Sequence, residues 1–167
     1  IKIATPILIA QIPNPEKDRI DLVYGIEMRS LPIVKPSWKI DGKIPSSDNE
    51  IILGFEVAKH HGIKVGDYLS YPHLGAKFKV AGIVKGTGSQ DDAFIYMPIK
   101  TTQVLLKKPS GATAIGVKVR KPDLLEIVVN DISEKIPGIQ IVTMNQVMNS
   151  IANLAASAKI LSLSIAF

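Results

Sequence analysis

The sequence predicts an α+β fold with two lobes, in which a mainly-β lobe is inserted into a split α/β lobe. Residues 50–97 contain short β-prone runs separated by turn residues. Residues 113–142 instead follow the order strand, helix, strand, and a second helical pattern comes after them. Residues 1–28 hold two further β-prone runs, which could complete the sheet of the split lobe.

Length and composition agree with this division. The chain has 167 residues, of which 46% are hydrophobic and 21% charged, enough for one domain or two small lobes that share a core. We assign residues 1–30 and 110–150 to the α/β lobe and residues 31–109 to the inserted lobe. Residues 144–167 are expected to form a helix that leads towards a transmembrane span.

Charge and cysteine content exclude several kinds of site. The net charge is +5, and the lysines are scattered along the chain. No Lys/Arg-rich run of the kind that follows a nucleic-acid backbone is present. The chain has no cysteine, so it has neither disulfides nor thiolate sites.

The first part of the chain predicts a hairpin followed by an irregular stretch. Residues 1–12 and 20–28 are β-prone, and a proline-rich turn at residues 13–15 separates them. Residues 29–49 are rich in turn residues and are expected to be irregular. Trp38 lies alone in that stretch, and we expect it to cover the core rather than to bind a ligand.

The middle of the chain alternates short strands with one or two helical turns. Gly62 is expected to end the first helix in the left-handed conformation, and Gly66 to allow a tight turn before Asp67. Gly82, inside a strand, suggests a bulge or a close backbone approach. We expect strands at residues 50–53, 68–71, 77–84 and 94–97, and helices at residues 54–61 and 102–106.

The last block alternates strand and helix. A half-buried strand is expected at residues 115–119, and a second strand is expected at residues 139–142. Between them a helix begins at Pro122 and ends at Pro137. Its apolar stripe consists of Leu125, Val128, Val129, Ile132 and Ile136, and its polar face includes Glu126, Asn130, Asp131, Glu134 and Lys135.

The terminal helix is expected to begin at Thr143, which has the spacing of a capping box with Gln146. After Lys159 the pattern becomes apolar on nearly all sides, and no Gly or Pro terminates it. This apolar part is shorter than the roughly 20 residues of a membrane span. We expect the first turns of such a span. A helix that packs on the domain's own core is the alternative.

No residue pattern indicates catalysis, a cofactor or a metal. His60, His61 and His73 match no zinc spacing and are expected at the surface, since neighbours on a helix point about 100° apart. Residues 86–89 could form an anion-binding nest, but a hairpin loop is preferred because the Lys and the helix of a P-loop are missing. The acidic pair at residues 91–92 would make a poor calcium site. We therefore predict a domain that is not an enzyme.

A series of motifs in the middle of the chain resembles a known family. The motifs are Glu50-Ile51-Ile52-Leu53-Gly54-Phe55-Glu56-Val57-Ala58, Gly62-Ile63-Lys64-Val65-Gly66-Asp67, Phe78-Lys79-Val80-Ala81-Gly82-Ile83-Val84, Thr87-Gly88-Ser89 before Asp91-Asp92, Tyr96-Met97-Pro98-Ile99, and Gln103. Together they resemble the extracytoplasmic (periplasmic core) domain of MacB-like ABC transporter permeases, a group that includes lipoprotein-releasing and FtsX-like permeases. The order and spacing hold from about residue 25 to residue 146. Residues 29–49 do not match the family's usual glycine–arginine stretch.

The resemblance implies a location and a set of partners. The domain would lie between two transmembrane helices, on the periplasmic or extracellular face of the cell membrane. In this family a split α/β lobe, similar to the porter domains of other efflux pumps, lies near the membrane, and a mainly-β lobe is inserted in it. A cytoplasmic ABC ATPase, a second permease copy and an extracytoplasmic adaptor or substrate protein would be its partners, and no nucleic acid would be. Its function would be to couple ATP-driven transmembrane motion to export or release of a substrate. The alternative is a soluble substrate- or partner-binding module that is not tied to a membrane span.

Overall fold

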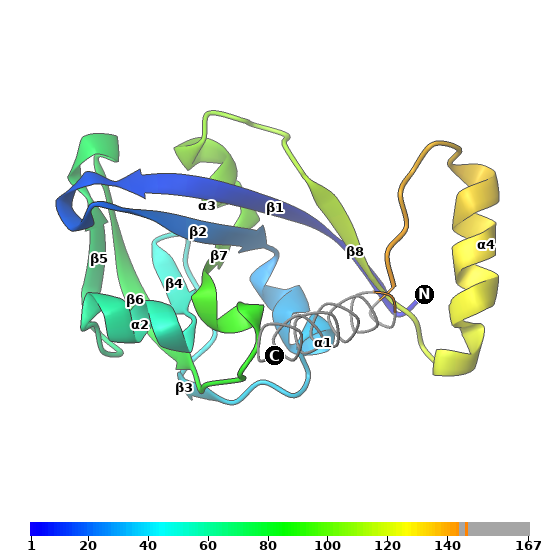
Figure 1. The fold of residues 1–167 in the computed structure, drawn as a ribbon, viewed down its shortest axis with the longest axis horizontal. Helices are drawn as coiled ribbons and strands as arrows, with labels where there is room; N and C mark the ends of the chain where they lie inside the picture. The colour runs from blue at the N-terminus through cyan, green and yellow to red at the C-terminus, as the bar shows by residue number, and fades with distance from the viewer. Residues whose placement is uncertain (144–145, 147–167) are drawn as a thin grey trace, which may run out of the picture. The chain divides into compact units, whose positions relative to one another are not determined.

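The computed structural model describes residues 1–143 and residue 146 (Figure 1). The chain divides into two compact units, Ile1–Arg120 and Lys121–Phe167. The first unit contains β1 (Ile3–Asn14), β2 (Arg19–Ile26), α1 (Leu31–Val34), β3 (Ile40–Gly42), β4 (Glu50–Leu53), α2 (Phe55–His61), β5 (Tyr68–Tyr71), β6 (Ala76–Val84), β7 (Phe94–Pro98), α3 (Ile99–Leu105) and β8 (Ala114–Lys118). The described part of the second unit contains α4 (Leu125–Lys135).

All eight strands of the first unit belong to one mixed sheet. Its order is β3-β6-β4-β7-β2-β1-β8, and β5 pairs with β6 on the edge that β3 also uses. The β2–β7 and β4–β6 pairs are parallel, and the other pairs are antiparallel. The α+β class is thus confirmed. Strands expected in two different lobes are joined by the pairing of β2 with β7, so the division into two lobes is not confirmed.

A bulge in β6 changes which face its side chains occupy. Ile51 pairs with Val80 and Ile52 pairs with Gly82, so Ala81 is an extra residue in β6. A Cβ on Gly82 would lie 2.7 Å from Ile40 Cγ2 and 2.8 Å from the carbonyl oxygen of Lys43. The prediction for Gly82 is confirmed on both counts, because the bulge and the close approach occur together.

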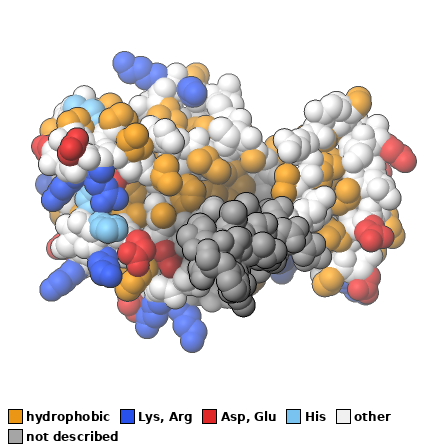
Figure 2. All heavy atoms as spheres, in the orientation of Figure 1, with side chains coloured by type: hydrophobic (Ala, Val, Ile, Leu, Met, Phe, Trp, Pro, Cys, Tyr) orange, Lys and Arg blue, Asp and Glu red, His pale blue; other side chains and the backbone are white. Residues whose placement is uncertain are grey.

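One face of the sheet is only partly covered. Ile7, Ile26, Ile52, Val84 and Tyr96 form an apolar cluster there with Leu31 of α1. Trp38 packs edge-on against Tyr96, with ring centroids 4.7 Å apart, and so covers the core as predicted. Figure 2 shows hydrophobic side chains gathered over β1 and β2. Ile9 of β1 is 43% exposed.

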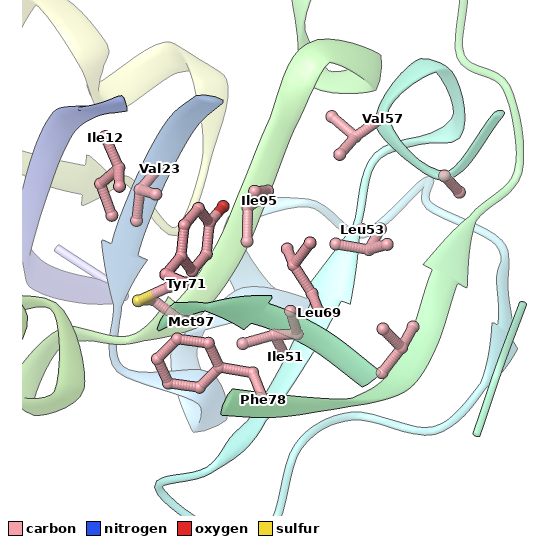
Figure 3. Packing of buried hydrophobic residues seen from close by; sticks show 12 residues of the cluster. Ile12, Val23, Ile51, Leu53, Val57, Leu69, Tyr71, Phe78, Ile95 and Met97 are labelled. Atoms are coloured by element: carbon pink, nitrogen blue, oxygen red, sulfur yellow. The ribbon is translucent and has the colours of Figure 1, made fainter. Parts of the chain in front are cut away.

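The opposite face carries the larger cluster (Figure 3). α2 and α3 cover it, and α3 lies directly on β2, because a Cβ on Gly25 would be 2.5 Å from Thr102 Oγ1. Gly25 therefore sets the approach of this helix to the sheet. The buried members of the cluster are Ile12, Val23, Ile51, Leu53, Val57, Ala58, Leu69, Tyr71, Phe78, Val80, Ile95 and Met97.

Two glycine predictions are confirmed, and two predictions of local structure are wrong. Gly62 caps α2 with φ 65°, and Gly66 has φ 94°. Residues 29–49 are not simply irregular, since they include α1 and β3. Residues 139–142 do not form a strand, because no strand pairs with them among the described residues and a short strand needs a partner for its backbone groups.

The described part of the second unit agrees with the predicted amphipathic helix. Leu125, Val128, Val129 and Ile132 of α4 are half-buried, whereas Ile136 is exposed. The predicted polar face is exposed throughout. A 3-10 turn at Pro122–Leu124 opens α4, as the proline predicted.

The predicted capping box is present. Gln146 N–H donates to Thr143 Oγ1 at 3.3 Å, and Thr143 N–H donates to Gln146 Oε1 at 2.7 Å. The rest of the predicted terminal helix, residues 144–145 and 147–167, lies outside the described residues. In the part of the chain that is described, no helix is long and apolar enough to cross a membrane.

Candidate functional site

The first candidate is a buried carboxylate near the turn of the β1–β2 hairpin. Asp21 Oδ2 accepts hydrogen bonds from Asn14 Nδ2 at 3.0 Å and from the Tyr71 hydroxyl at 2.8 Å. Asp21 Oδ1 lies 3.2 Å from His61 Nε2 and 3.0 Å from Arg19 Nε. These side chains come from β1, β2, α2 and β5, so one carboxylate connects four elements.

Burial and hydrogen bonding act in opposite directions on this carboxylate. Burial raises the pKa of Asp21, but hydrogen bonds from His61, Asn14 and Tyr71 outweigh it and lower the pKa to about 2. Burial, followed by the nearby Asp21 charge, raises the pKa of the Tyr71 hydroxyl far above its ordinary range. Tyr71 is therefore a neutral donor and not a nucleophile, and the cluster holds the hairpin in place.

This cluster corrects one prediction. His60 and His73 are exposed, as expected, but only 2% of the His61 side chain is exposed. His61 is the last residue of α2, and it faces Asp21 rather than water. Sequence reasoning missed Asp21 because it read the strand only as β-prone. The available signal was its position, since Asp21, Val23 and Gly25 share one face of β2 and the other two face the core.

The second candidate is the loop at residues 87–89, which surrounds Asp92. The Asp92 carboxylate accepts hydrogen bonds from Thr87 N–H, Gly88 N–H and the Thr87 hydroxyl at 2.8–3.0 Å. Burial raises the pKa of Asp92, and these hydrogen bonds outweigh it and lower the pKa. The loop is thus an anion-binding nest, but the anion is the chain's own carboxylate.

The neighbouring Asp91 belongs to a separate set of contacts. Lys35 Nζ lies 2.7 Å and 2.8 Å from its two carboxylate oxygens, and Trp38 Nε1 donates to it at 3.2 Å. The Tyr96 hydroxyl donates to the Asp91 carbonyl at 3.0 Å. A cavity of about 400 Å³ adjoins Asp91 and also contacts Lys39 and Lys85. Both carboxylates of the acidic pair therefore have partners within the chain. Asp91 alone connects residues 29–49, through Lys35 and Trp38, with Tyr96 of β7.

No constellation for chemistry assembles among the described residues. Within them, no group of three or more His, Cys, Asp or Glu side chains could hold a metal ion. The two carboxylate centres stabilise loops and a hairpin. A further candidate feature is a groove along β1, where Ile9 is exposed.

Comparison with known proteins gives a consistent picture. Residues 2–135 match the family described as the MacB-like periplasmic core domain. The periplasmic region of MacB from Actinobacillus actinomycetemcomitans is similar in structure, with a TM-score of 0.62 and 18% identity, over 92% of this chain and 77% of that one. The extracellular domain of the noncanonic ABC-type transporter YknZ from Gram-positive bacteria has a TM-score of 0.60 and 14% identity, over 81% of this chain and 76% of that one. No curated protein matches the chain in sequence.

Proposed function

The chain belongs to the family of MacB-like periplasmic core domains of ABC transporter permeases, and from this membership we propose that it couples ATP-driven motion of transmembrane helices to export or release of a substrate outside the membrane. The family match over residues 2–135 is the observation that carries the proposal. Permease domains of this kind are generally not enzymes. The proposed role is accordingly binding and transmission of motion, without catalysis.

The connections of the first unit support transmission of motion. Ile3 pairs with Lys118, and Arg120 Nε donates to the Ile1 carbonyl at 3.3 Å. The start and the end of this unit therefore lie side by side. A domain inserted between two transmembrane helices needs both connections at one end, which this arrangement provides.

The continuous sheet supports the same proposal. A displacement of β1 and β8 passes through backbone hydrogen bonds to β2, β7, β4 and β6. Because packed and hydrogen-bonded elements move together as rigid bodies, the far edge of the sheet would follow the edge nearest the connections. We propose that residues 144–167 lead towards the second membrane span, so that motion enters through both connections.

The proposed partners follow from the family. They are a cytoplasmic ABC ATPase, on the same chain or another, and a second permease copy. An extracytoplasmic adaptor or substrate protein would meet the domain on the periplasmic or extracellular face of the membrane.

Distance measurements in the full-length permease test the proposal. These 167 residues contain no cysteine, so Lys59→Cys on the exposed surface of α2 provides a single position for a spin label once any cysteine elsewhere in the permease is replaced by serine. In lipid nanodiscs, we expect the label-to-label distance between two copies to change between the nucleotide-free and ATP-trapped states. The same distribution in both states, or no dipolar coupling at all, would contradict the proposal.

A matched variant separates transmission from simple movement. A flexible Gly-Ser segment inserted after Arg120 loosens one of the two connections, so it should reduce the nucleotide-dependent change and leave ATP hydrolysis intact. Retention of the full distance change would show that the connection at Arg120 does not carry the motion.

A further inference from the structure

β1 has an open edge beyond its pairing with β8. That pairing ends at Ile7, although β1 continues to Asn14, and no other strand lies on that side among residues 1–120. Ile9 N–H points to that side, since it donates to Thr113 Oγ1 at 2.9 Å. Backbone groups alternate along a strand, so the N–H and C=O of Gln11 also point there. The Ile9 N–H is already bonded to Thr113, so the Gln11 N–H and C=O are the groups that a further strand would pair with.

The part of the β1 edge that can pair with another strand is short. Pro13 comes two residues after Gln11 and has no N–H to offer, which limits pairing in that direction. Thr113 limits pairing in the other direction. An added segment would therefore be short, about five residues long at the rise of a β-strand.

A groove runs along this edge. A cavity of about 590 Å³ is lined by residues 8–11 of β1, by Leu22 and Phe94, and by Leu106, Lys108 and Thr113. Ile9 is 43% exposed within it. Ile9 and Leu22 lie on the same face of the β1–β2 pair, because Ile9 pairs with Tyr24 and Gln11 pairs with Leu22. Figure 2 shows hydrophobic side chains gathered over β1 and β2.

The lining of the groove carries a single positive charge. Lys108 is the only charged residue among those that line the cavity, and no acidic side chain is among them. Lys107 before it has φ 55°, which turns the chain after α3 and brings Lys108 alongside β1. An occupant with one acidic side chain complements this lining.

We propose that the groove binds an extended segment of a partner protein, which adds to β1 as a strand. Apolar side chains of the segment would pack on Ile9 and Leu22, and an acidic side chain would reach Lys108. In strand addition, main-chain hydrogen bonds provide affinity and pockets for alternate side chains provide specificity. A lipid surface would leave the Gln11 N–H without a partner in an apolar environment, which is costly.

The test uses a defined peptide and the 167-residue chain, with neither membrane nor nucleotide. The peptide has seven residues, in which valine and threonine alternate around a central aspartate, and both ends are blocked. We expect saturable binding in NMR titrations, with the largest shift changes at the amides of residues 9–11. Ile9→Glu should weaken binding by about tenfold or more, as expected for loss of a buried apolar contact.

Val104→Glu is the matched control. Val104 is 78% exposed on α3 and does not line the groove, so the same substitution there should leave binding unchanged. Gln11→Pro removes the edge donor, and the fold should tolerate it because Pro13 already occupies an equivalent position on the same edge.

Exchanging the charges of Lys108 and of the peptide's central residue tests the proposal even if Gln11→Pro fails to fold. The Lys108→Glu variant should no longer bind the peptide with the central aspartate, and it should bind a peptide in which lysine replaces that aspartate. The proposal is overturned if the peptide does not bind, if Ile9→Glu and Val104→Glu behave alike, or if the exchange gives no rescue. Binding of anionic vesicles in place of the peptide, abolished by Ile9→Glu, would overturn it in favour of a membrane surface. None of these results depends on the coupling role proposed above.

Discussion

Replacing Asp21 with asparagine removes the charge at the centre of the hairpin cluster while keeping its shape. Hydrogen bonds to a charged group contribute about 1.5–3 kcal/mol each, and removing one partner of a buried ion pair costs about 3–5 kcal/mol. The Arg19 side chain is 29% exposed and can still be hydrated in part, so the lower end of the range applies. We expect Asp21→Asn to reduce the free energy of unfolding by about 3 kcal/mol.

Urea unfolding followed by circular dichroism measures this loss. With a denaturant dependence of about 2 kcal/mol per molar, the midpoint should fall by about 1.5 M. Asp41→Asn is the control, since Asp41 is exposed and its nearest partner, Lys85 Nζ at 3.2 Å, is exposed as well. An exposed pair contributes about 0–1 kcal/mol, so the control should shift the midpoint little. Equal midpoints for the two variants would refute the reasoning.

The pH dependence of the free energy of unfolding provides a second test of the same cluster. The pKa of Asp21 is about 2 in the folded chain, compared with 3.8 for an aspartate in the unfolded chain. Between pH 2 and pH 3.8 the unfolded chain therefore binds more protons than the folded chain. The stabilisation from Asp21 is therefore complete above about pH 4 and is lost as the pH falls through 2. Asp21→Asn should lack this part of the acid-induced loss. An identical acid profile in the variant would contradict the assigned pKa.

Three further outcomes follow from the fold. Gly66→Val should lower the free energy of unfolding by about 1 kcal/mol or more, because Gly66 has φ 94° while nothing within 4 Å would obstruct a side chain; an unchanged melting midpoint would disprove the conformational cost. Gly25→Ala should lower the free energy of unfolding by about 1–3 kcal/mol, because the added methyl group pushes α3 away from β2. Amide hydrogen exchange in α3 that is no faster than in the parent chain would count against it. Calorimetric titration with zinc or calcium should show no micromolar binding, whereas a stoichiometric heat signal would reveal a site that the residue spacing does not predict.

Local features of the fold could be predicted because their physical causes lie close together in the sequence. Gly62 and Gly66 stand where a helix ends and a turn begins, and only backbone geometry was needed to assign them. The bulge at Gly82 was predictable for the same reason. Thr143 and Gln146 are three residues apart, so their mutual hydrogen bonds were readable from spacing alone.

Features that depend on distant partners could not be predicted. β2 pairs with β7, although the paired residues lie about 70 positions apart in the sequence. No local sequence pattern indicates this pairing. The same pairing places the strands of both expected lobes in one sheet. His61 was misread because its partner, Asp21, is 40 residues away. The strand expected at residues 139–142 had suitable residues but no neighbouring strand in the described part of the chain.

The antiparallel pairing of β1 with β8 determines how the first unit responds to force. Ile1 and Arg120 lie at the same end of this ladder, so pulling them in opposite directions loads its backbone hydrogen bonds one at a time, beginning with the bond from Lys2 N–H to the Lys118 carbonyl. A ladder opened in this way peels at low force, whereas one loaded along its strands resists with all its bonds together. Movements that carry both ends in the same direction leave the ladder intact. The unit would therefore transmit a common displacement of its two connections and yield when they separate.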